Sequence, residues 1–325
     1  MKAIVHTAYG APLDVLRLSE RPIPTVSARK VLIRIRAASV NAGDWHLVRG
    51  VPRMVRLAFG LFRPKHDIIG SDCSGVVEAV GADVEGYSVG DEVFCDASLV
   101  GMGAFAEYIA VPVDVLCKKP RHISFEAAAA LPGAGVTALQ GLRDYGRLHA
   151  GHRVLINGAS GGVGSHAVQI AVAMGAHVTA VCSTRNVDFV HGLGAHEVVD
   201  YTKTDITTLR SRFDVFFDGA AYRPFSALLH LVSDAGTYVF VGGGTATMVR
   251  AMTLGPLVSR AKGKRVVSFM ARANAADLRE LATLVERGAL TSPIDRLYAF
   301  DHTAEAVAYV ETNRARGRVV IDVMA

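Results

Sequence analysis

Hydrophobic and polar residues alternate in several short runs along the first third of the chain. In the run VLIRIR, Val31, Ile33 and Ile35 fall on one face of an extended chain, while the arginines fall on the other. A period of two is typical of a half-buried strand. Similar short runs occupy residues 75–81 and 91–96. This part of the chain therefore predicts a compact β-rich domain.

The pattern changes near residue 120, after which apolar strand-like runs alternate with helix-like segments. One helix is expected after the potential cap Ser124, and another over 165–174, where Gly175 would end it. The expected strands are 153–157, 177–182, 197–201, 213–220, 237–244 and 265–270. Regular alternation of strands and helices predicts a parallel sheet with helices on both faces.

The C-terminal segment differs again. Helices are expected near 275–287 and over 303–311, followed by the apolar strand 318–323, which could pair with the N-terminal β-rich part. We therefore predict an α/β protein of two domains. Its predicted limits are residues 1–120 with 272–325 for the first, discontinuous domain and residues 121–271 for the second.

The strongest chemical signal is the segment RVLINGASGGVGSHAVQIA, in which a strand leads into a glycine cluster and then a helix. From Ala159 it reads A-x-G-x-x-G, the dinucleotide-binding fingerprint with alanine at the first glycine position. Gly161 would let a pyrophosphate approach the backbone, and amide groups at the helix N-terminus would face that anion. The predicted cofactor contacts in this loop are Ser160, Gly161, Gly162 and Val163.

The end of the following strand indicates which dinucleotide binds. NAD enzymes usually place Asp or Glu there, about 20 residues past the loop, to bind the ribose 2′-hydroxyl. This chain has Cys182, Ser183, Thr184 and Arg185, and the nearest acid after them is Asp188. Arg185 would attract a 2′-phosphate, and Ser183 could donate a hydrogen bond to it. The segment therefore favours NADPH over NADH.

Composition argues against several classes of protein. The net charge is +5 and the pI is near 9.1, but the basic residues are scattered rather than clustered as in nucleic-acid-binding proteins. The four cysteines form no C-x-x-C pair, so no zinc ribbon is predicted. The uncharged stretch of residues 127–142 is shorter than the roughly 20 residues of a membrane span. With no recognisable signal peptide, we expect a soluble, cytoplasmic protein that binds neither nucleic acid nor membrane.

Several further segments run in a familiar order along the chain. They are ASVNAGDWHLVRG (38–50), IIGSDCSGVVEAVG (68–81), VGDEVF (89–94), GAFAEY (103–108), AAALPGAGVTA, INGASGGVGSHAVQIA, VVDY (198–201) and GRVVI near the end. Together they resemble the medium-chain dehydrogenase/reductase superfamily, in particular its zinc-free quinone oxidoreductase branch. The resemblance implies a GroES-like β-rich domain, a Rossmann domain with a doubly wound parallel sheet, and a cleft that holds NADPH.

The departures from the zinc branch of that family matter most. Its alcohol dehydrogenases have Cys where this chain has Asn41, His where it has Ser71, and Cys near Gly133. Asn, Ser and Gly cannot replace thiolate and imidazole as zinc ligands. The four-cysteine loop that holds structural zinc in those relatives is also missing from the sequence. No metal site is therefore expected.

Without a Lewis acid, an alcohol or simple ketone is poorly activated, whereas a quinone or enone accepts hydride at an electrophilic carbon. The cofactor supplies the hydride, and the protein positions the substrate and stabilises the developing oxyanion. Asn41 is the first candidate for this catalytic role because its amide can donate a hydrogen bond and does not titrate. We therefore expect an NADPH-dependent quinone or enone oxidoreductase. A zinc-type alcohol dehydrogenase and a non-catalytic, crystallin-like NADPH-binding protein are the alternatives.

The resemblance assigns further residues to the cleft. Additional cofactor contacts are predicted at Thr137, Tyr201, Val241, Gly242, Gly243 and Arg318. Trp45 and His46 follow Asn41 and could line the substrate entrance. The apolar and basic segment 51–65 fits either a flap over the site or a partner surface. A small-molecule quinone or enone is the expected partner, and a homodimer is one option for the assembly.

Overall fold

The chain forms two compact units, each of which is described by itself. The structure is a computed structural model that describes residues 1–325, apart from the side chains of residues 260–262. The first unit contains residues 1–136, 272–287 and 292–325, and the second contains residues 137–271 and 288–291. The sequence placed a boundary after residue 120. Helix α4 (Phe125–Ala129), however, lies in the first unit, where Ala129 packs with Ala37 and Val320.

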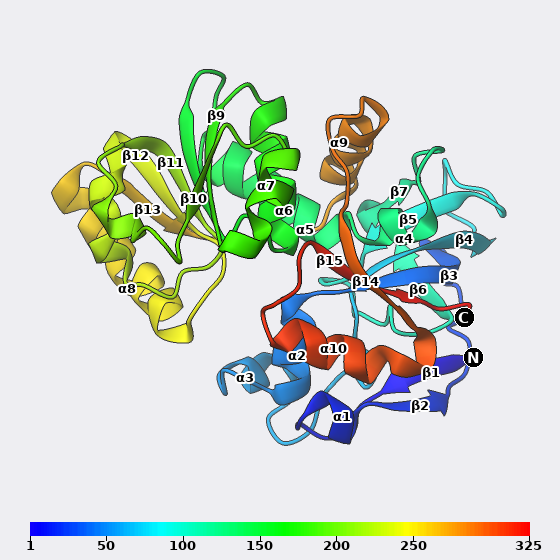
Figure 1. Ribbon diagram of the computed structural model, residues 1–325. Coiled ribbons are helices and arrows are strands. Elements are labelled where there is room, and N and C mark those ends of the chain that lie inside the picture. Colours follow the sequence, from blue (N-terminus) through cyan, green and yellow to red (C-terminus); the bar gives the residue numbers. More distant parts are fainter. The chain divides into compact units, whose positions relative to one another are not determined.

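The first unit is built on strands from both ends of the chain (Figure 1). They are β1 (Lys2–Val5), β2 (Arg17–Glu20), β3 (Lys30–Val40), β4 (Asp72–Val80), β5 (Glu92–Asp96), β6 (Tyr108–Pro112), β7 (Leu116–Lys118), β14 (Ile294–Ala299) and β15 (Arg318–Asp322). β1 and β2 form a separate pair, and the others form a seven-stranded sheet in the order β14-β15-β3-β4-β5-β7, with β6 also paired to β3. All pairs in this sheet are antiparallel except β14–β15.

The register of this sheet follows the hydrophobic pattern of the sequence. Val31, Ile33 and Ile35 are completely buried, whereas Arg34 between them is exposed. β15 pairs antiparallel with β3, from Val319 opposite Val40 to Asp322 opposite Ala37, so the expected pairing of the C-terminal strand is observed. The helices of this unit besides α4 are α1 (Pro12–Val15), α2 (Ala42–Arg49), α3 (Val55–Phe59), α9 (Ala275–Glu286) and α10 (Thr303–Glu311).

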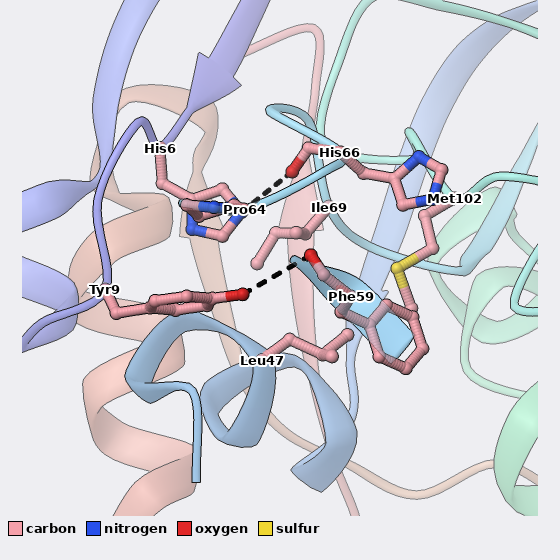
Figure 2. A pocket seen from close by; sticks show the side chains of 8 residues that line it. All are labelled: His6, Tyr9, Leu47, Phe59, Pro64, His66, Ile69 and Met102. Carbon is pink, nitrogen blue, oxygen red and sulfur yellow. Dashed lines mark hydrogen bonds between the residues drawn. The ribbon is translucent and has the colours of Figure 1, made fainter. Parts of the chain in front are cut away.

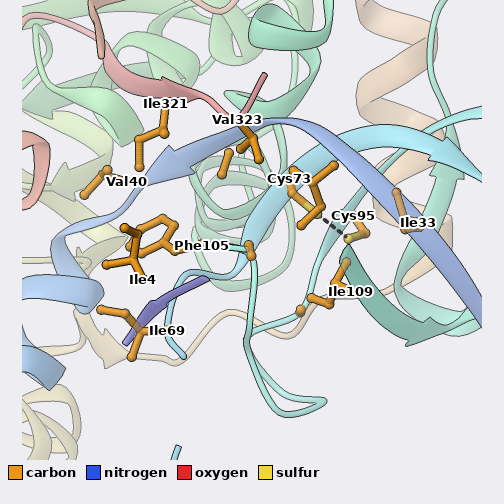
Figure 3. Packing of buried hydrophobic residues seen from close by; sticks show 14 of the residues in the cluster. Ile4, Ile33, Val40, Ile69, Cys73, Cys95, Phe105, Ile109, Ile321 and Val323 are labelled. Atoms are coloured by element: carbon orange, nitrogen blue, oxygen red, sulfur yellow. Dashed lines mark hydrogen bonds between the residues drawn. The ribbon is translucent and has the colours of Figure 1, made fainter. Parts of the chain in front are cut away.

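The core of the first unit packs beneath this sheet (Figure 3). It joins Ile4 and Ile321, residues from opposite ends of the chain. Cys73 on β4 faces Cys95 on β5, with their Sγ atoms 3.4 Å apart, and both thiols are free and buried. The hydrogen bond with Cys73 and burial raise the pKa of Cys95 well above its usual range. These cysteines therefore behave as apolar packing groups.

The second unit is a doubly wound parallel sheet. Its strands are β8 (Arg153–Asn157), β9 (His177–Cys182), β10 (Glu197–Asp200), β11 (Phe213–Asp218), β12 (Val232–Phe240) and β13 (Arg265–Ser268). They lie in the order β10-β9-β8-β11-β12-β13, and every pair is parallel. The chain thus builds outward from β8 in both directions, which is the Rossmann arrangement. Its α-helices are α6 (Gly162–Ala173), α7 (Val187–Gly192) and α8 (Thr245–Lys262), and α5 (Pro132–Gln140) spans the boundary between the units.

None of the helices in the described part of the chain combines the length and the apolar character that crossing a bilayer requires.

Candidate functional site

The glycine loop lies where β8 ends and α6 begins. A Cβ atom at Gly164 would lie 2.1 Å from the carbonyl oxygen of Gly158, so the helix approaches the loop too closely for any other residue. A Cβ atom at Gly161 would meet nothing nearer than that same oxygen, 3.5 Å away, so the space beside this residue is open. The loop therefore leaves a free approach to the N-terminus of a twelve-residue helix, which is what an anionic pyrophosphate needs.

The other predicted cofactor contacts of the second unit gather at the same sheet edge. All its strands are parallel, so their carboxyl ends share one edge. Ser183 and Arg185 follow β9, Tyr201 follows β10, and Val241, Gly242 and Gly243 follow β12. Thr137 lies instead on α5, where it is half-buried. Arg185 and Tyr201 are exposed, so both are accessible to a ligand.

Ser160 links the glycine loop to the segment that follows β9. Its Oγ accepts a hydrogen bond from Asn186 Nδ2 at 2.9 Å, and Asn186 itself is buried. This bond fixes the segment that carries Ser183 and Arg185 relative to the loop. No motif in the sequence points to Asn186.

Sequence reasoning also missed a carboxylate at this edge. Asp200 ends β10 and lies opposite Cys182 in the pairing of β9 with β10. Its side chain accepts hydrogen bonds from Thr184 Oγ1 at 2.6 Å and Thr202 Oγ1 at 2.7 Å, and Lys203 Nζ is 3.7 Å away. These interactions, the Thr184 hydrogen bond above all, lower the pKa of Asp200 to about 2. A negative charge therefore stands beside the residues predicted to bind a 2′-phosphate.

In the first unit, Asn41, Ser71 and Gly133 lie together. Asn41 precedes α2, and its Nδ2 donates a hydrogen bond to Ser71 Oγ at 3.1 Å. A Cβ atom at Gly133 would lie 3.2 Å from Asn41 Oδ1 and 2.8 Å from Asp72 Oδ2, so no larger side chain fits there. The three positions that the resemblance equates with zinc ligands are thus adjacent, but they present an amide, a hydroxyl group and no side chain. Among the described residues, no three His, Cys, Asp or Glu side chains are grouped to hold a metal ion.

A buried ion pair lies directly behind Ser71. Ser71 Oγ donates to Asp72 Oδ1 at 3.1 Å, and Asp72 Oδ2 accepts hydrogen bonds from Arg318 Nη2 at 2.9 Å and from the Gly133 amide at 3.0 Å. Burial and the nearby Asp96 together raise the pKa of Asp72 to about 7, against the opposing charge of Arg318. Asn41, Ser71 and Asp72 therefore form one continuous hydrogen-bonded chain.

Arg318 was predicted to contact the cofactor. Its side chain is only 5% exposed, and Nη2 also donates to Ser39 Oγ at 2.7 Å. Its Nε is buried and has no hydrogen-bond partner among the described residues. This placement favours a structural role beneath Asp72, and the cofactor contact remains a prediction.

Trp45 and His46, the predicted substrate residues, lie on α2 next to Asn41. Their rings stack with centroids 3.6 Å apart, and both are half-buried. His46 Nδ1 donates to the Val51 carbonyl oxygen at 2.9 Å, and burial lowers the pKa of His46. The Trp45 indole Nε1 is buried and has no hydrogen-bond partner in the part of the chain that the structure describes. Nothing in these contacts assigns the two rings to a substrate, so that role also remains a prediction.

A small pocket of the first unit was not foreseen from the sequence (Figure 2). It is lined by His6, Tyr9, Leu47, Phe59, Pro64, His66, Ile69 and Met102. His6 Nε2 donates to the His66 carbonyl oxygen at 3.0 Å, while the buried Nδ1 has no partner among the described residues. The segment 51–65 thus supplies Phe59 and Pro64 to the wall of a mainly apolar pocket.

Comparison with known proteins places the chain in a family. A model of the alcohol dehydrogenase GroES-like domain matches residues 27–121, and a model of the zinc-binding dehydrogenases matches residues 193–321. A chloroplastic quinone-oxidoreductase homolog from Spinacia oleracea is 32% identical over 99% of this chain and 98% of its own length. The chain belongs to the medium-chain dehydrogenase/reductase superfamily, in its zinc-free, quinone oxidoreductase-like branch.

Other relatives of this superfamily agree. The 2-methylene-furan-3-one reductase of Solanum lycopersicum is 34% identical over 99% of this chain and 79% of its own length. The solved structure of the quinone oxidoreductase from Coxiella burnetii is 30% identical, covers 99% of both chains and superposes with a TM-score of 0.87. The predicted family and the predicted GroES-like and Rossmann fold are therefore confirmed. As a member of this superfamily, the chain is an oxidoreductase with a nicotinamide-cofactor domain.

Proposed function

We propose that this chain is a zinc-independent oxidoreductase that transfers a hydride from NADPH to a quinone or another conjugated carbonyl compound. One observation carries the proposal. Asn41, Ser71 and Gly133, which the resemblance equates with the zinc ligands of alcohol dehydrogenases, come together and present an amide, a hydroxyl group and no side chain in place of metal ligands. The names of several relatives, which include an NADPH-dependent alkenal/one oxidoreductase of Arabidopsis thaliana, support the same class of acceptor.

The glycine loop fits the proposed cofactor, because the space beside Gly161 is open and faces the start of α6. We assign Ser160, Gly161, Gly162 and Val163 to the pyrophosphate. Arg185 and Tyr201 would contact the 2′-phosphate of NADPH, with Ser183 as a further donor. The negative charge of Asp200 would repel a phosphate at this edge. Its carboxylate oxygens accept hydrogen bonds from the hydroxyl groups of Thr184 and Thr202, which stabilise that charge.

When bound, the cofactor supplies the hydride. Asn41 donates to Ser71 Oγ, and its amide also interacts with the Asp72 carboxyl group. We assign to the same amide the donation to a substrate oxygen as that oxygen gains negative charge. Ser71 in turn donates to Asp72, so its oxygen is held as an acceptor toward Asn41. The chain of hydrogen bonds thereby fixes the orientation of the Asn41 amide. Asp72 and Ser71 act as positioning residues, and Asn41 acts as the oxyanion donor.

A screen of NADPH oxidation against quinones, enones, aldehydes and ketones tests the proposal. We expect turnover of quinones or enones in protein that has been dialysed against a chelator. Asn41→Ala should lower kcat/KM by about 100-fold, the usual effect of removing one oxyanion donor, while NADPH affinity stays unchanged. Asn313→Gly, which changes an exposed asparagine of the first unit and suits the left-handed backbone there, serves as the control.

Two results would contradict the proposal. Turnover of alcohols or aldehydes that requires added zinc would support a zinc-type alcohol dehydrogenase instead. NADPH binding without turnover of any acceptor would support a crystallin-like protein.

The proposal also includes NADPH rather than NADH as the cofactor and a cytoplasmic location. Sedimentation of the purified protein would show whether it forms a homodimer.

A further inference from the structure

A recess in the second unit lies at the sheet edge opposite the glycine loop. The parallel strands β8, β11, β12 and β13 begin there, so it is separate from their carboxyl ends, where the cofactor contacts gather. Its volume is about 320 Å³, large enough for a small anion together with its water. It is lined by Gly146, Arg147, His149, His152, Asp214, Ser233, Asp234, Ala235, Gly236, Thr237 and Arg265.

Two arginines of this recess lack carboxylate partners. Among the described side chains, Arg147 forms no hydrogen bond or ion pair, and Arg265 forms only a long contact of 3.5 Å from Nη1 to Thr237 Oγ1. Both guanidinium groups line this recess, and burial together with the like charge of Arg147 lowers the pKa of Arg265, as expected of repulsion between them. A bound anion between them would convert this repulsion into two attractive, charge-assisted interactions.

The histidines of the recess add hydrogen-bond donors. His152 Nδ1 accepts a hydrogen bond from the His149 backbone N–H at 3.3 Å, so in the neutral ring the proton lies on Nε2. The His149 and His152 rings meet edge to face, with centroids 5.3 Å apart. His152 Nε2 is thus a donor without a described partner, in the same recess as the two arginines.

The carboxylates of the recess already have partners. Asp214 accepts hydrogen bonds from the Arg153 amide at 2.9 Å and from Ser233 Oγ at 3.1 Å. Asp234 lies at the exposed rim and pairs with Arg212 at 3.4 Å. Both carboxylates of the recess are therefore engaged by donors other than Arg147 and Arg265.

The backbone of the recess adds an independent sign of a site. Arg147 and Ala235 have φ angles of +55° and +64°, the left-handed conformation that residues other than glycine seldom adopt. Strained residues of this kind cluster at ligand sites, where the surrounding structure holds them in place. Here both residues line the same recess.

We propose that this recess binds a phosphate group, either as inorganic phosphate or as a phosphate monoester, between Arg147 and Arg265. The proposal does not depend on the proposed oxidoreductase function. A dianionic phosphate matches the paired guanidinium groups, and its remaining oxygens can accept hydrogen bonds from His152 and Thr237.

Calorimetric titration of the protein saturated with NADP⁺ tests this inference, because the bound cofactor blocks phosphate binding at the glycine loop. The titrants are inorganic phosphate and glycerol 3-phosphate, with chloride at equal ionic strength as the reference. We expect saturable binding of phosphate, and tighter binding of the ester would identify a monoester as the better ligand. Arg265→Gln and Arg147→Gly should each weaken binding by about tenfold or more.

Arg147→Gly suits the left-handed backbone at that position, so this variant is expected to fold even if Arg265→Gln does not. Arg210→Gln, which changes an exposed cation of the same unit outside the recess, is the matched control. Absence of saturable binding to the unchanged protein would overturn the inference. So would equal phosphate affinity in Arg147→Gly and Arg210→Gln.

Discussion

Asp44 and Asp72 show how far a residue can depart from its behaviour in water. Both are buried near Arg318, and the carboxyl group of Asp96 lies close enough to raise their pKa values. Burial raises the pKa of Asp44 to about 7, although its Oδ2 accepts a hydrogen bond from the backbone N–H of Asn41 at 2.7 Å. A buried guanidinium that faces several carboxyl groups cannot neutralise all of them, so the protonated form of some is favoured.

This arrangement predicts that the free energy of unfolding depends on pH. The pKa of Asp44 is about 7 in the folded chain, against 3.8 for an aspartate exposed to water in the unfolded chain. Between these two pH values, the folded chain keeps a proton on Asp44 that the unfolded chain has lost. Stability should therefore fall as pH rises from about 4 to about 7. Asp44→Asn keeps an oxygen acceptor for Asn41 and should remove part of this fall, by about 1 kcal/mol or more. Urea unfolding at pH 5 and pH 8 measures it.

The matched control is Asp83→Asn, which changes an exposed carboxylate of the same unit. It should leave the difference between pH 5 and pH 8 as it is in the unchanged protein. If Asp44→Asn behaves in the same way as this control, Asp44 is ionised in the folded chain and the argument from burial is wrong.

Arg185 and Asp200 should have opposite effects on the choice of cofactor. Arg185→Ala should weaken NADPH by about tenfold or more and leave NADH nearly unchanged, because only NADPH carries the 2′-phosphate. Asp200→Asn should strengthen NADPH by removing a like charge at the same edge. Fluorescence titration with both cofactors measures these changes, with Arg210→Ala as the control. An equal loss of both cofactors in Arg185→Ala would refute the phosphate role.

At the scale of elements, two glycines of the glycine loop have different roles: Gly161 leaves space for the cofactor, whereas Gly164 is needed for close packing of the fold. Gly161→Val should leave the free energy of unfolding nearly unchanged, since its Cβ enters open space, but should abolish cofactor binding by filling that space. Gly164→Ala should instead destabilise the fold by about 2 kcal/mol, because its Cβ would overlap the Gly158 carbonyl oxygen. Thermal unfolding and NADPH titration of both variants distinguish the two effects. Unchanged NADPH affinity in Gly161→Val would rule out the loop as the pyrophosphate site.

Buried strands could be predicted from the sequence because a short apolar run is stable only when the core buries it. The runs 153–157, 177–182 and 318–323 correspond to β8, β9 and β15 to within a residue. α8 was missed: it contains Pro256 and exposes Met252 and Leu257, so its sequence shows no clear apolar face. Helix α6 also starts at Gly162 rather than near Ser165, because the close packing of the loop makes glycines acceptable in its first turn.

For the site, sequence reasoning found the residues that motifs carry and missed those that pairing brings in. Asn41 and Gly161 stand in recognisable segments; the structure places Asn41 beside Ser71 and leaves open space beside Gly161. Asp200 is far along the chain from Arg185 and reaches the same edge only because β10 pairs with β9. The ion pair of Arg318 with Asp72 could not be predicted either, because the two residues lie far apart in the sequence and meet only through the fold.

At the scale of the whole molecule, removal of metal should have no effect. The cluster of Asn41, Ser71 and Gly133 is complete through its own hydrogen bonds. Exhaustive dialysis against a chelator should therefore change neither the melting temperature nor the turnover of quinones. Metal analysis together with calorimetry checks this expectation. One equivalent of zinc that survives dialysis, or a drop in melting temperature when it is removed, would contradict it.

The place of β15 between β14 and β3 also sets an order of assembly during synthesis. Residues 318–322 leave the ribosome after the whole of the parallel sheet, so the unit that begins first is completed second. Until then, Ala37–Val40 of β3 lack their partner strand, while β6 covers Lys30–Arg34 along the same edge. An unpaired strand edge readily pairs with other extended chains. A nascent chain of this protein therefore carries a complete parallel-sheet unit and an incomplete β-rich unit. The incomplete unit, with its unpaired strand edge, is the one that we expect to need protection by chaperones.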